Sequence, residues 1–283
     1  MKSIIFSLLF VFTPITVMAN ELTVTDHDKI STTISRDHYS FPFMDGPFIE
    51  QKKLDRLFDT IAQKIDKEPV DAMINDRGEI IPEKPGYVLD REKFNRQFRA
   101  FFYEGKPTTL EIPKRLVYPK VDSELLSTIR EKKVGSYVTR FQESNKERSH
   151  NIALAAEAIN NYVLLPDETF SFNKVVGKRT KEKGYMRAPV IVKGELAEDI
   201  GGGICQVSST LYNAVDINGI EIVERYSHSR SVPYVPPGRD ATVSWYGPDF
   251  VFANKSHQPI LIRTRAIDGQ MAIQVYSADT PKQ

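Results

Sequence analysis

Three consecutive glycines stand almost directly before the only cysteine of the chain, in the stretch "GGGICQVSSTLYNA" (201–214). Glycine lets a chain turn sharply and lets another backbone approach closely, and the apolar run that follows has the length of a helix. The pattern predicts a tight turn at Gly201, Gly202 and Gly203 and a helix that begins at about Cys205. A lone cysteine cannot form an intrachain disulfide, so its thiol is a small buried side chain, an intermolecular link or a reactive group.

The predicted position of Cys205 suits a reactive thiol. The first turn of a helix favours a negative charge, because the macrodipole and the free N–H groups point at it. Such a site lowers the pKa of a thiol, and the same N–H groups can stabilise an oxyanion. No Lys-Ser or Lys-Thr pair follows the glycines, so the loop is not a P-loop.

A nucleophilic cysteine also needs a base, and His228 and Asp240 follow Cys205 in that order. A cysteine at a helix N-terminus, a histidine on one strand and an aspartate on the next match the order of a transglutaminase-like or papain-like triad. Asp249 or Asn254 could orient His228 instead. The competing interpretation is an ordinary strand-edge histidine and a turn aspartate.

Zinc is a weaker interpretation of the same residues. Cys205 and His228 make two candidate ligands, whereas structural zinc takes four protein ligands and catalytic zinc usually three. The other histidines are scattered along the chain. We therefore expect neither a metal nor another cofactor.

Residues 1–19 have the pattern of an export signal. Lys2 precedes a short apolar run, and a small residue, Ala19, marks the expected cleavage point. The run is too short to span a bilayer, and no later stretch is long enough. Removing Lys2 takes the formal net charge of +1 to about zero, which argues against a nucleic-acid partner. We expect a secreted protein, extracellular or wall-associated, without a membrane span after cleavage.

The remaining chain divides into three parts by its pattern. Residues 20–44 are polar without a clear period and are expected to be a tether. Residues 45–130 carry two amphipathic helix patterns and short extended pieces, which predict a small α+β domain. Residues 131–283 predict a second α+β domain, in which the cysteine helix packs on an antiparallel sheet containing residues 220–224 and 241–246. Asp268 and Gly269, between two alternating runs, predict a hairpin.

Four blocks of the second domain resemble the VanW family: "FSFNKVVG", "GGGICQVSSTLYNA", "ERYSHSRSVPYVPPGRDATV" and "DFVFANKS". The resemblance covers about residues 135–264. The preceding domain, with "RGEIIPEKPGYVLD" and "LEIPKRLVYPKV", is more loosely similar to the peptidoglycan-binding domain that often precedes VanW domains. The positions that match the family blocks are Gly201, Gly202, Gly203, Cys205, Gln206, Ser208, His228, Tyr234, Gly238 and Asp240.

The resemblance implies a cell-envelope protein whose partners are peptidoglycan or cell-wall precursor peptides. In one interpretation it is a cysteine-dependent peptidase, amidase or acyltransferase, with Cys205 as nucleophile, His228 as base and Asp240 as orienting group. Gln206 or the N–H groups of the glycine loop would then hold the oxyanion, with Ser208 and Tyr234 also in the binding loop. In the other interpretation the chain is a non-catalytic wall-binding or accessory module linked to the glycopeptide-antibiotic response, whose loop grips a stem-peptide carboxylate.

Overall fold

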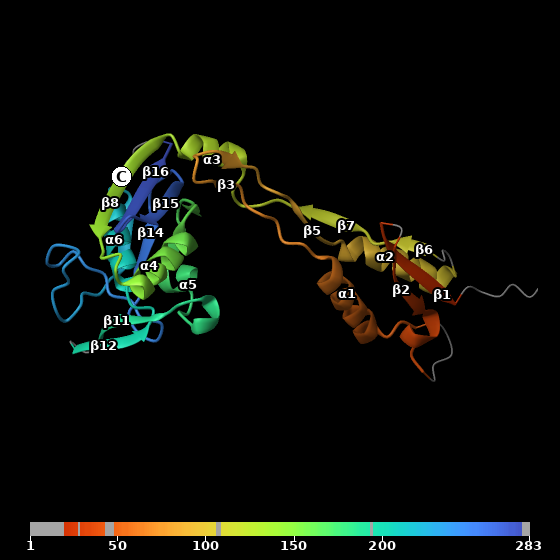
Figure 1. Cartoon of the computed structure of the whole chain (residues 1–283). Helices are drawn as coiled ribbons and strands as arrows, with labels where there is room; N and C mark the ends of the chain where they lie inside the picture. The colour runs from red at the N-terminus through yellow and green to blue at the C-terminus, as the bar shows by residue number, and fades with distance from the viewer. Residues whose placement is uncertain (1–19, 28, 43–47, 106–108, 193–194, 279–283) are drawn as a thin grey trace, which may run out of the picture. The chain divides into compact units, whose positions relative to one another are not determined.

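The computed structural model describes residues 20–27, 29–42, 48–105, 109–192 and 195–278. The predicted export signal, residues 1–19, lies outside these residues. The described chain forms two compact units. The N-terminal unit runs to Val70 and includes Lys84–Pro119, and the C-terminal unit consists of Asp71–Glu83 and the chain from Lys120 onward. Both mix helices with small sheets (Figure 1), which confirms the expected α+β class.

The N-terminal unit has a core of leucine and phenylalanine side chains from two helices. Asp90 caps the second helix by accepting a hydrogen bond from the N–H of Lys93, and Gly105 ends it at a φ of 66°. Phe94, Phe98 and Phe102 on that helix are fully buried. The elements are β1 (Glu21–Asp26), β2 (Lys29–Ser35), the 3-10 helix η1 (Arg36–Tyr39), α1 (Gln51–Ile65), β5 (Gly86–Leu89), α2 (Arg91–Glu104), β6 (Thr109–Glu111) and β7 (Lys114–Val117).

The segment expected to be a tether is part of this fold. Strand β1 is the centre of a sheet in the order β2-β1-β6, antiparallel to β2 and parallel to β6. Leu22 and Val24 alternate on β1 and are fully buried. The expectation for residues 20–44 is therefore wrong for the described part, because two alternating apolar side chains suffice to hold a strand on a core that the rest of the unit supplies.

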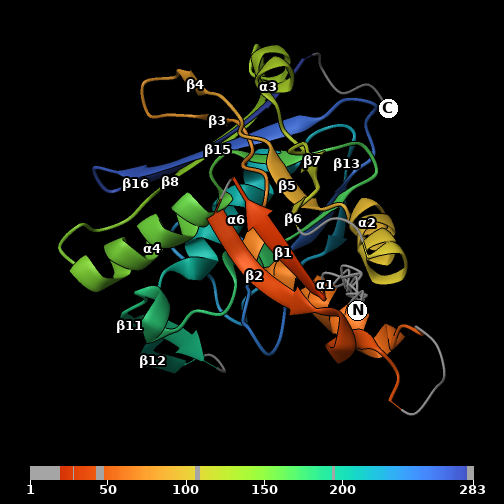
Figure 2. The same cartoon turned by 90° about the vertical axis from the view of Figure 1, so that its right-hand side faces the viewer.

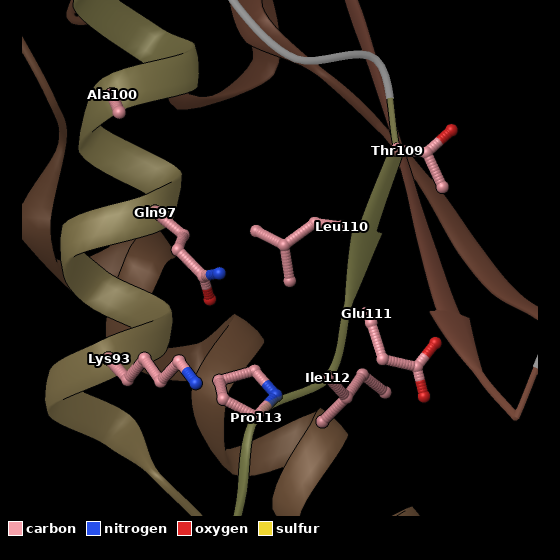
Figure 3. Close-up of a pocket in the computed structure, with 8 residues that line it drawn as sticks. All are labelled: Lys93, Gln97, Ala100, Thr109, Leu110, Glu111, Ile112 and Pro113. Atoms are coloured by element: carbon pink, nitrogen blue, oxygen red, sulfur yellow. The ribbon is translucent and has the colours of Figure 1, made fainter.

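A cavity of about 430 Å³ lies between α2 and β6 in the N-terminal unit. Gln97 on α2 and Leu110 on β6 point toward one another across it (Figure 3). The side-chain oxygen Oε1 of Gln97 is buried and has no hydrogen-bond partner among the described residues. Such an acceptor can receive a hydrogen bond from a ligand or water.

The C-terminal unit is built on a four-stranded antiparallel sheet in the order β8-β16-β15-β9. Its central strands form the predicted hairpin, and Asp268 and Gly269 at the turn both have positive φ, as the tightest hairpin turns require. The elements are β3 (Met73–Ile74), β4 (Ile80–Ile81), α3 (Ser123–Ile129), β8 (Lys132–Arg140), α4 (Lys146–Ile159), β9 (Tyr162–Leu164), β10 (Thr169–Ser171), α5 (Phe172–Val176), the 3-10 helix η2 (Lys181–Lys183), β11 (Arg187–Val192), β12 (Glu195–Ile200), α6 (Ile204–Val215), β13 (Ile220–Glu224), β14 (Val251–Asn254), β15 (Ile260–Ile267) and β16 (Gln270–Ser277).

Two helices cover this sheet. Helix α6, which carries the cysteine, packs on β8 and β16, while α4 packs on β15 and on α6. A second sheet has the order β10-β14-β13, and the hairpin β11–β12 projects beside α4 (Figures 1 and 2). Both helices bury apolar side chains in one core with strands of the two sheets.

The sheet predicted beneath the cysteine helix is only partly right. Residues 220–224 are a strand, β13, but at the edge of the second sheet rather than in the sheet that α6 contacts. Residues 241–246 are irregular. Their backbone is held by scattered partners: the N–H of Ala241 donates to Ser209 Oγ and that of Thr242 to the carbonyl of Tyr226. These local bonds satisfy the backbone without a strand ladder.

Among the described residues, none of the helices combines the length and the apolarity that crossing a bilayer needs.

Candidate functional site

The glycine turn and the helix start lie where the sequence predicts. Helix α6 begins at Ile204, with Gly203 as its N-cap at a φ of 107°, so Cys205 stands in the first turn. That φ favours glycine. Gly202 meets a different constraint: a Cβ there would lie 2.6 Å from the carbonyl oxygen of Ala188 on β11.

Gly201 and Gly203 make room for two arginine side chains. A Cβ on Gly201 would lie 3.1 Å from Cβ of Arg179, and a Cβ on Gly203 would lie 3.0 Å from Cγ of Arg148. Arg148 belongs to the first turn of α4, and Arg179 follows α5. The glycine turn thus lies between the aliphatic stems of these two arginines.

The thiol of Cys205 is half-buried and faces a cavity of about 950 Å³. Its Sγ lies 3.5 Å from the carbonyl oxygen of Val243 and 3.7 Å from Oγ1 of Thr242. Tyr234 and His228 also line the cavity. The irregular segment that replaces the predicted strand therefore forms a wall beside the thiol.

His228 and Asp240 form a close buried pair. The Nδ1 atom of His228 lies 2.6 Å from Oδ2 of Asp240, and the backbone N–H of His228 donates to the same oxygen at 2.6 Å. Cys205 and His228 line the same cavity, and each shifts the pKa of the other. Because Nδ1 is engaged by the carboxylate, the ring nitrogen left for the thiol is Nε2. The structure thus brings the three predicted residues together.

The protonation states of this chain of groups are coupled. Burial opposes ionisation of Cys205, but the hydrogen bond and charge of His228 outweigh it and lower the pKa of the thiol. Burial likewise opposes charging of His228, but Cys205 and then Asp240 raise its pKa above the ordinary value. For Asp240, burial is outweighed by hydrogen bonds from His228, so its pKa is lowered. These directions favour a thiolate and an imidazolium facing each other.

The alternative orienting groups lie elsewhere in the unit. Asp249 accepts hydrogen bonds from Ser171 Oγ and from the N–H of Asn173. The side-chain amide of Asn254 donates to the carbonyls of Leu164 and Gln258. Their side chains are thus engaged with partners other than His228. The placement of His228 and Asp240 also differs from the expectation, because both lie in the irregular connection between β13 and β14 rather than on strands.

Two other predicted loop residues make contacts that hold the scaffold. The side-chain amide nitrogen of Gln206 donates to Thr139 Oγ1 and to the carbonyl of Arg140. Its donors are thereby used, which contradicts the expectation that Gln206 holds an oxyanion. Ser208 is fully buried and its hydroxyl donates to the carbonyl of Ala241, so it fastens the cavity wall to α6 instead of facing a ligand.

Of the two remaining residues that match the family blocks, Tyr234 lines the cavity and Gly238 forms an exposed turn. Tyr234 lines the cavity, and burial raises the pKa of its phenol, with a hydrogen bond to Ser209 opposing that shift. Tyr234 is therefore a neutral hydrogen-bond donor in the cavity that Cys205 also lines. Gly238 is exposed and has a φ of 75°, and a Cβ at this position would meet no other atom within 4 Å, so the glycine serves the turn alone.

The sequence patterns did not reveal the basic character of the cavity. Four cationic side chains line it, against the single carboxylate of Asp199. Their signal in the sequence is weak, since charged residues in the first turn of a helix or in a loop are usually solvated. Trp245 and Tyr246 also line the cavity and are 42% and 86% exposed. The cationic residues are Arg140, Arg148, Lys178 and Arg179.

The one cluster of the described residues with spacing suited to a metal ion lies in the N-terminal unit. It consists of Asp26, His27 and Glu111, of which the last two are exposed. Asp26 already pairs with Lys114 at 2.6 Å, and Glu111 accepts hydrogen bonds from Thr25 and from the N–H of His27. The carboxylates are thus satisfied by protein groups.

Two family models match the chain. The model described as "VanW like protein" matches residues 147–276, and the model described as "Putative peptidoglycan binding domain" matches residues 47–111. The first match contains the whole Cys205–His228–Asp240 group. The second covers part of the N-terminal unit, which begins earlier, at β1.

Two curated proteins are similar in sequence. The uncharacterized protein YoaR of Bacillus subtilis (strain 168) is 54% identical over 260 residues, which are 92% of this chain and 86% of that protein. The vancomycin B-type resistance protein VanW of Enterococcus faecalis (strain ATCC 700802 / V583) is 33% identical over 78 residues, 28% of each chain. No solved structure matches.

Proposed function

The chain belongs to the VanW family, and from that membership and the site geometry we propose that it breaks an amide bond of peptidoglycan stem peptides through a thioester on Cys205. Its VanW and peptidoglycan-binding domains are those of a cell-wall-associated protein. The observation that carries the proposal is the His228–Asp240 pair, joined at 2.6 Å, whose histidine lines the same cavity as Cys205. The export signal expected at residues 1–19 would bring the site to the wall.

In the first half of the proposed reaction the thiolate of Cys205 attacks the carbonyl carbon of the amide. A C–S bond forms and the carbonyl oxygen takes the negative charge. When the C–N bond breaks, the imidazolium of His228 gives its Nε2 proton to the leaving amine. Asp240 keeps the ring oriented, because one of its oxygens binds both Nδ1 and the backbone N–H of His228.

In the second half an acceptor restores the enzyme. His228, now neutral, takes a proton from an incoming amine or water, which attacks the thioester and releases Cys205. An amine gives a new peptide bond, and water gives hydrolysis. Gln206 has no free side-chain donor for the oxyanion. The backbone N–H of Cys205 itself, which has no acceptor among the described residues, is the better candidate.

The test is incubation with purified peptidoglycan, followed by mass analysis of the products. Wild-type protein should release or rearrange stem-peptide fragments. Cys205→Ala and His228→Ala should each lower the rate by about three orders of magnitude or more, and the double variant should be little worse, because such groups act as a unit. Asp216→Asn, which removes a carboxylate paired with Arg239 outside the site, is the matched control. Product formation by Cys205→Ala at the wild-type rate would refute the proposal.

The alternative function is a wall-binding module without catalysis. The match of residues 47–111 to a peptidoglycan-binding model favours binding by the N-terminal unit. Its cavity beside Gln97, with a buried acceptor lacking a partner among the described residues, is the candidate contact. Retention of the whole protein on insoluble peptidoglycan, lost in Gln97→Leu, together with no turnover by wild type, would favour this alternative.

A further inference from the structure

Arg148 and Arg179 stand beside the reactive thiol and bond only to uncharged acceptors among the described residues. Arg148 donates from Nη2 to Oε1 of Gln206 at 2.7 Å. Arg179 donates from Nη1 to Oδ1 of Asn173 at 2.8 Å and to the carbonyl of Gly177 at 3.0 Å. Neither arginine forms an ion pair with a carboxylate within the described part of the chain.

Both guanidinium groups are partly removed from water, and burial lowers the pKa of each arginine. Tyr234 and then Cys205 oppose this shift at Arg148. Cys205 opposes it most strongly at Arg179, ahead of weaker influences that include Asp249. Cys205 therefore favours the charged form of both arginines. The two arginines belong to different elements, α4 and the segment after α5. Burying two like charges beside one cavity is unfavourable unless an anion compensates them.

The thiolate of Cys205 does not fill that requirement. Its lowered pKa is attributable to His228, and the ion pair that these two form is internally neutral. Cys205, His228 and Asp240 together carry a net charge of about −1, and Asp199 adds one more negative charge to the cavity lining. Four cationic side chains line the same cavity, so a positive excess remains. Each guanidinium carries five donors in a planar fork, and the contacts with Gln206 and Asn173 use one nitrogen of each. Donors suited to a planar oxyanion thus remain.

We propose that Arg148 and Arg179 form the receptor for a carboxylate of the peptide substrate, next to the amide that Cys205 attacks. This inference rests on the proposed function, since it names a feature of the same substrate. A guanidinium pair matches a carboxylate in shape and charge, and such charge-assisted hydrogen bonds are stronger than neutral ones. The carboxylate is either the C-terminus of the leaving residue or a side-chain carboxylate of the residue whose carbonyl forms the thioester with Cys205.

The glycine turn also makes room for the two arginines of the proposed carboxylate receptor. Side chains at residues 201 and 203 would press on the stems of Arg179 and Arg148. Glycine at these positions keeps both arginines close to the first turn of α6, where Cys205 lies. Arg148 and Arg179 are thus specificity-determining residues.

A charged alkylating reagent tests the arginines without any peptide. Iodoacetate carries a carboxylate and iodoacetamide does not, so the ratio of their rate constants on Cys205 reports the local positive charge. We expect Arg148→Gln and Arg179→Gln each to lower the iodoacetate-to-iodoacetamide ratio by about tenfold, the scale of a charged hydrogen bond. Arg187→Gln, which removes an exposed arginine on β11 outside the cavity lining, should leave the ratio unchanged. Equal ratios in wild type and both cavity variants would overturn the inference.

Binding to the inactive Cys205→Ala protein distinguishes the two carboxylate sources. Calorimetry measures the affinity of three stem peptides. One is amidated at the C-terminus, one at the side-chain carboxylate, and one at neither. Amidation of the recognised carboxylate should weaken binding about tenfold or more, and this difference should vanish when Arg148→Gln and Arg179→Gln are added. Failure of both amidations to weaken binding, or absence of binding by all three peptides, would contradict the inference.

The outcomes separate this inference from the proposed function. A wild-type protein that turns over no peptidoglycan but shows the arginine-dependent ratio refutes catalysis and retains the carboxylate receptor. If the arginine variants slow turnover while the alkylation ratio and the peptide affinities stay constant, the guanidinium groups serve the reaction alone and the receptor is refuted. Arg148→Lys and Arg179→Lys, which keep the charge but lose the fork, should preserve the ratio better than the glutamine variants if the variants are folded.

Discussion

At the scale of single residues, the orientation of His228 depends on one oxygen atom. Oδ2 of Asp240 binds the backbone N–H of His228 and its Nδ1 atom, both at 2.6 Å, and the side chains are only 7% and 8% exposed. Two bonds to one oxygen fix both the ring rotation and the tautomer, so that Nε2 is left for the thiol. A carboxylate that held the ring alone would leave its rotation less constrained.

The first prediction concerns the reactivity of the thiol with pH. The pKa of Cys205 is lowered and that of His228 raised, so both shifts favour the thiolate–imidazolium pair, and the thiolate is lost as pH falls through the pKa of Cys205. Alkylation by iodoacetamide should therefore stay fast below the ordinary thiol pKa. In His228→Ala, the main lowering influence is gone and burial remains, so the inflection should move upward. Rate constants measured across pH decide this, and an unchanged inflection would show that His228 does not control the thiol.

At the scale of elements, the turn between β12 and α6 is held by contacts with α4 and β11. The buried amide of Asn151, on α4, donates to the carbonyls of Gly202 and Met186 and accepts from the N–H of Met186. The backbone of Gly202 itself lies against Ala188 and Pro189 of β11. The position of the thiol therefore depends on how α4, β11 and α6 meet.

The second prediction compares Gly202, where a side chain would clash with the backbone of β11, with Gly238, where a side chain would meet no other atom. In Gly202→Ala the new methyl group would lie 2.6 Å from a backbone oxygen, which cannot move without shifting β11. We expect a loss of about 1–3 kcal/mol in the free energy of unfolding, the usual cost of overpacking, and a slower alkylation of Cys205. Gly238→Ala, in open space at a φ of 75°, should cost only about 1–2 kcal/mol of backbone strain and leave alkylation unchanged. Thermal unfolding and alkylation of both variants test this, and unaltered alkylation in Gly202→Ala would show that the turn does not position the thiol.

At the scale of the whole molecule, the two units are interleaved along the sequence. The chain leaves the N-terminal unit after Val70, returns at Lys84 and leaves again after Pro119. The intervening residues, 71–83, pair with the C-terminal unit, where the N–H of Ala72 donates to the carbonyl of Val121 and Asn161 bonds both backbone groups of Ile74. The boundary expected at residue 130 therefore differs from the boundary of the structure.

The third prediction follows from this interleaving. A fragment of residues 45–130 lacks β1, whose Leu22 and Val24 are buried in the core, and carries residues 120–130 that belong to the other unit. We expect it to remain unfolded, whereas a fragment of residues 20–119 should fold, with residues 71–83 unpaired. Circular dichroism and cooperative thermal melting distinguish the two. A cooperative transition in the shorter fragment would show that β1 is dispensable.

Local patterns in the sequence determined the parts of this protein whose geometry is local. The helix α6 that carries Cys205, the capped phenylalanine helix α2 and the hairpin at Asp268–Gly269 each depend on side chains a few positions apart, which share one face or one turn. The order Cys205, His228, Asp240 is also visible in the chain, and the family blocks that contain these residues indicated the cell envelope. Alternation alone misled at residues 241–246, because it does not reveal whether a neighbouring strand is available.

Only the tertiary structure decided which distant groups meet. Arg148 contacts Gln206, which is 58 positions away in the sequence, and Thr139 contacts the same glutamine, which is 67 positions away. Helix and strand periodicity extends over only a few residues, so it cannot predict either contact. The same holds for β1, whose Thr25 contacts Leu110 of β6 across 85 positions. Burial distinguishes Arg148 and Arg179 from the many charged side chains in water, because a half-buried guanidinium beside a cavity is stabilised by a negative partner. Packing therefore selected Arg148 and Arg179 for the site and assigned Gln206 and Ser208 to the scaffold.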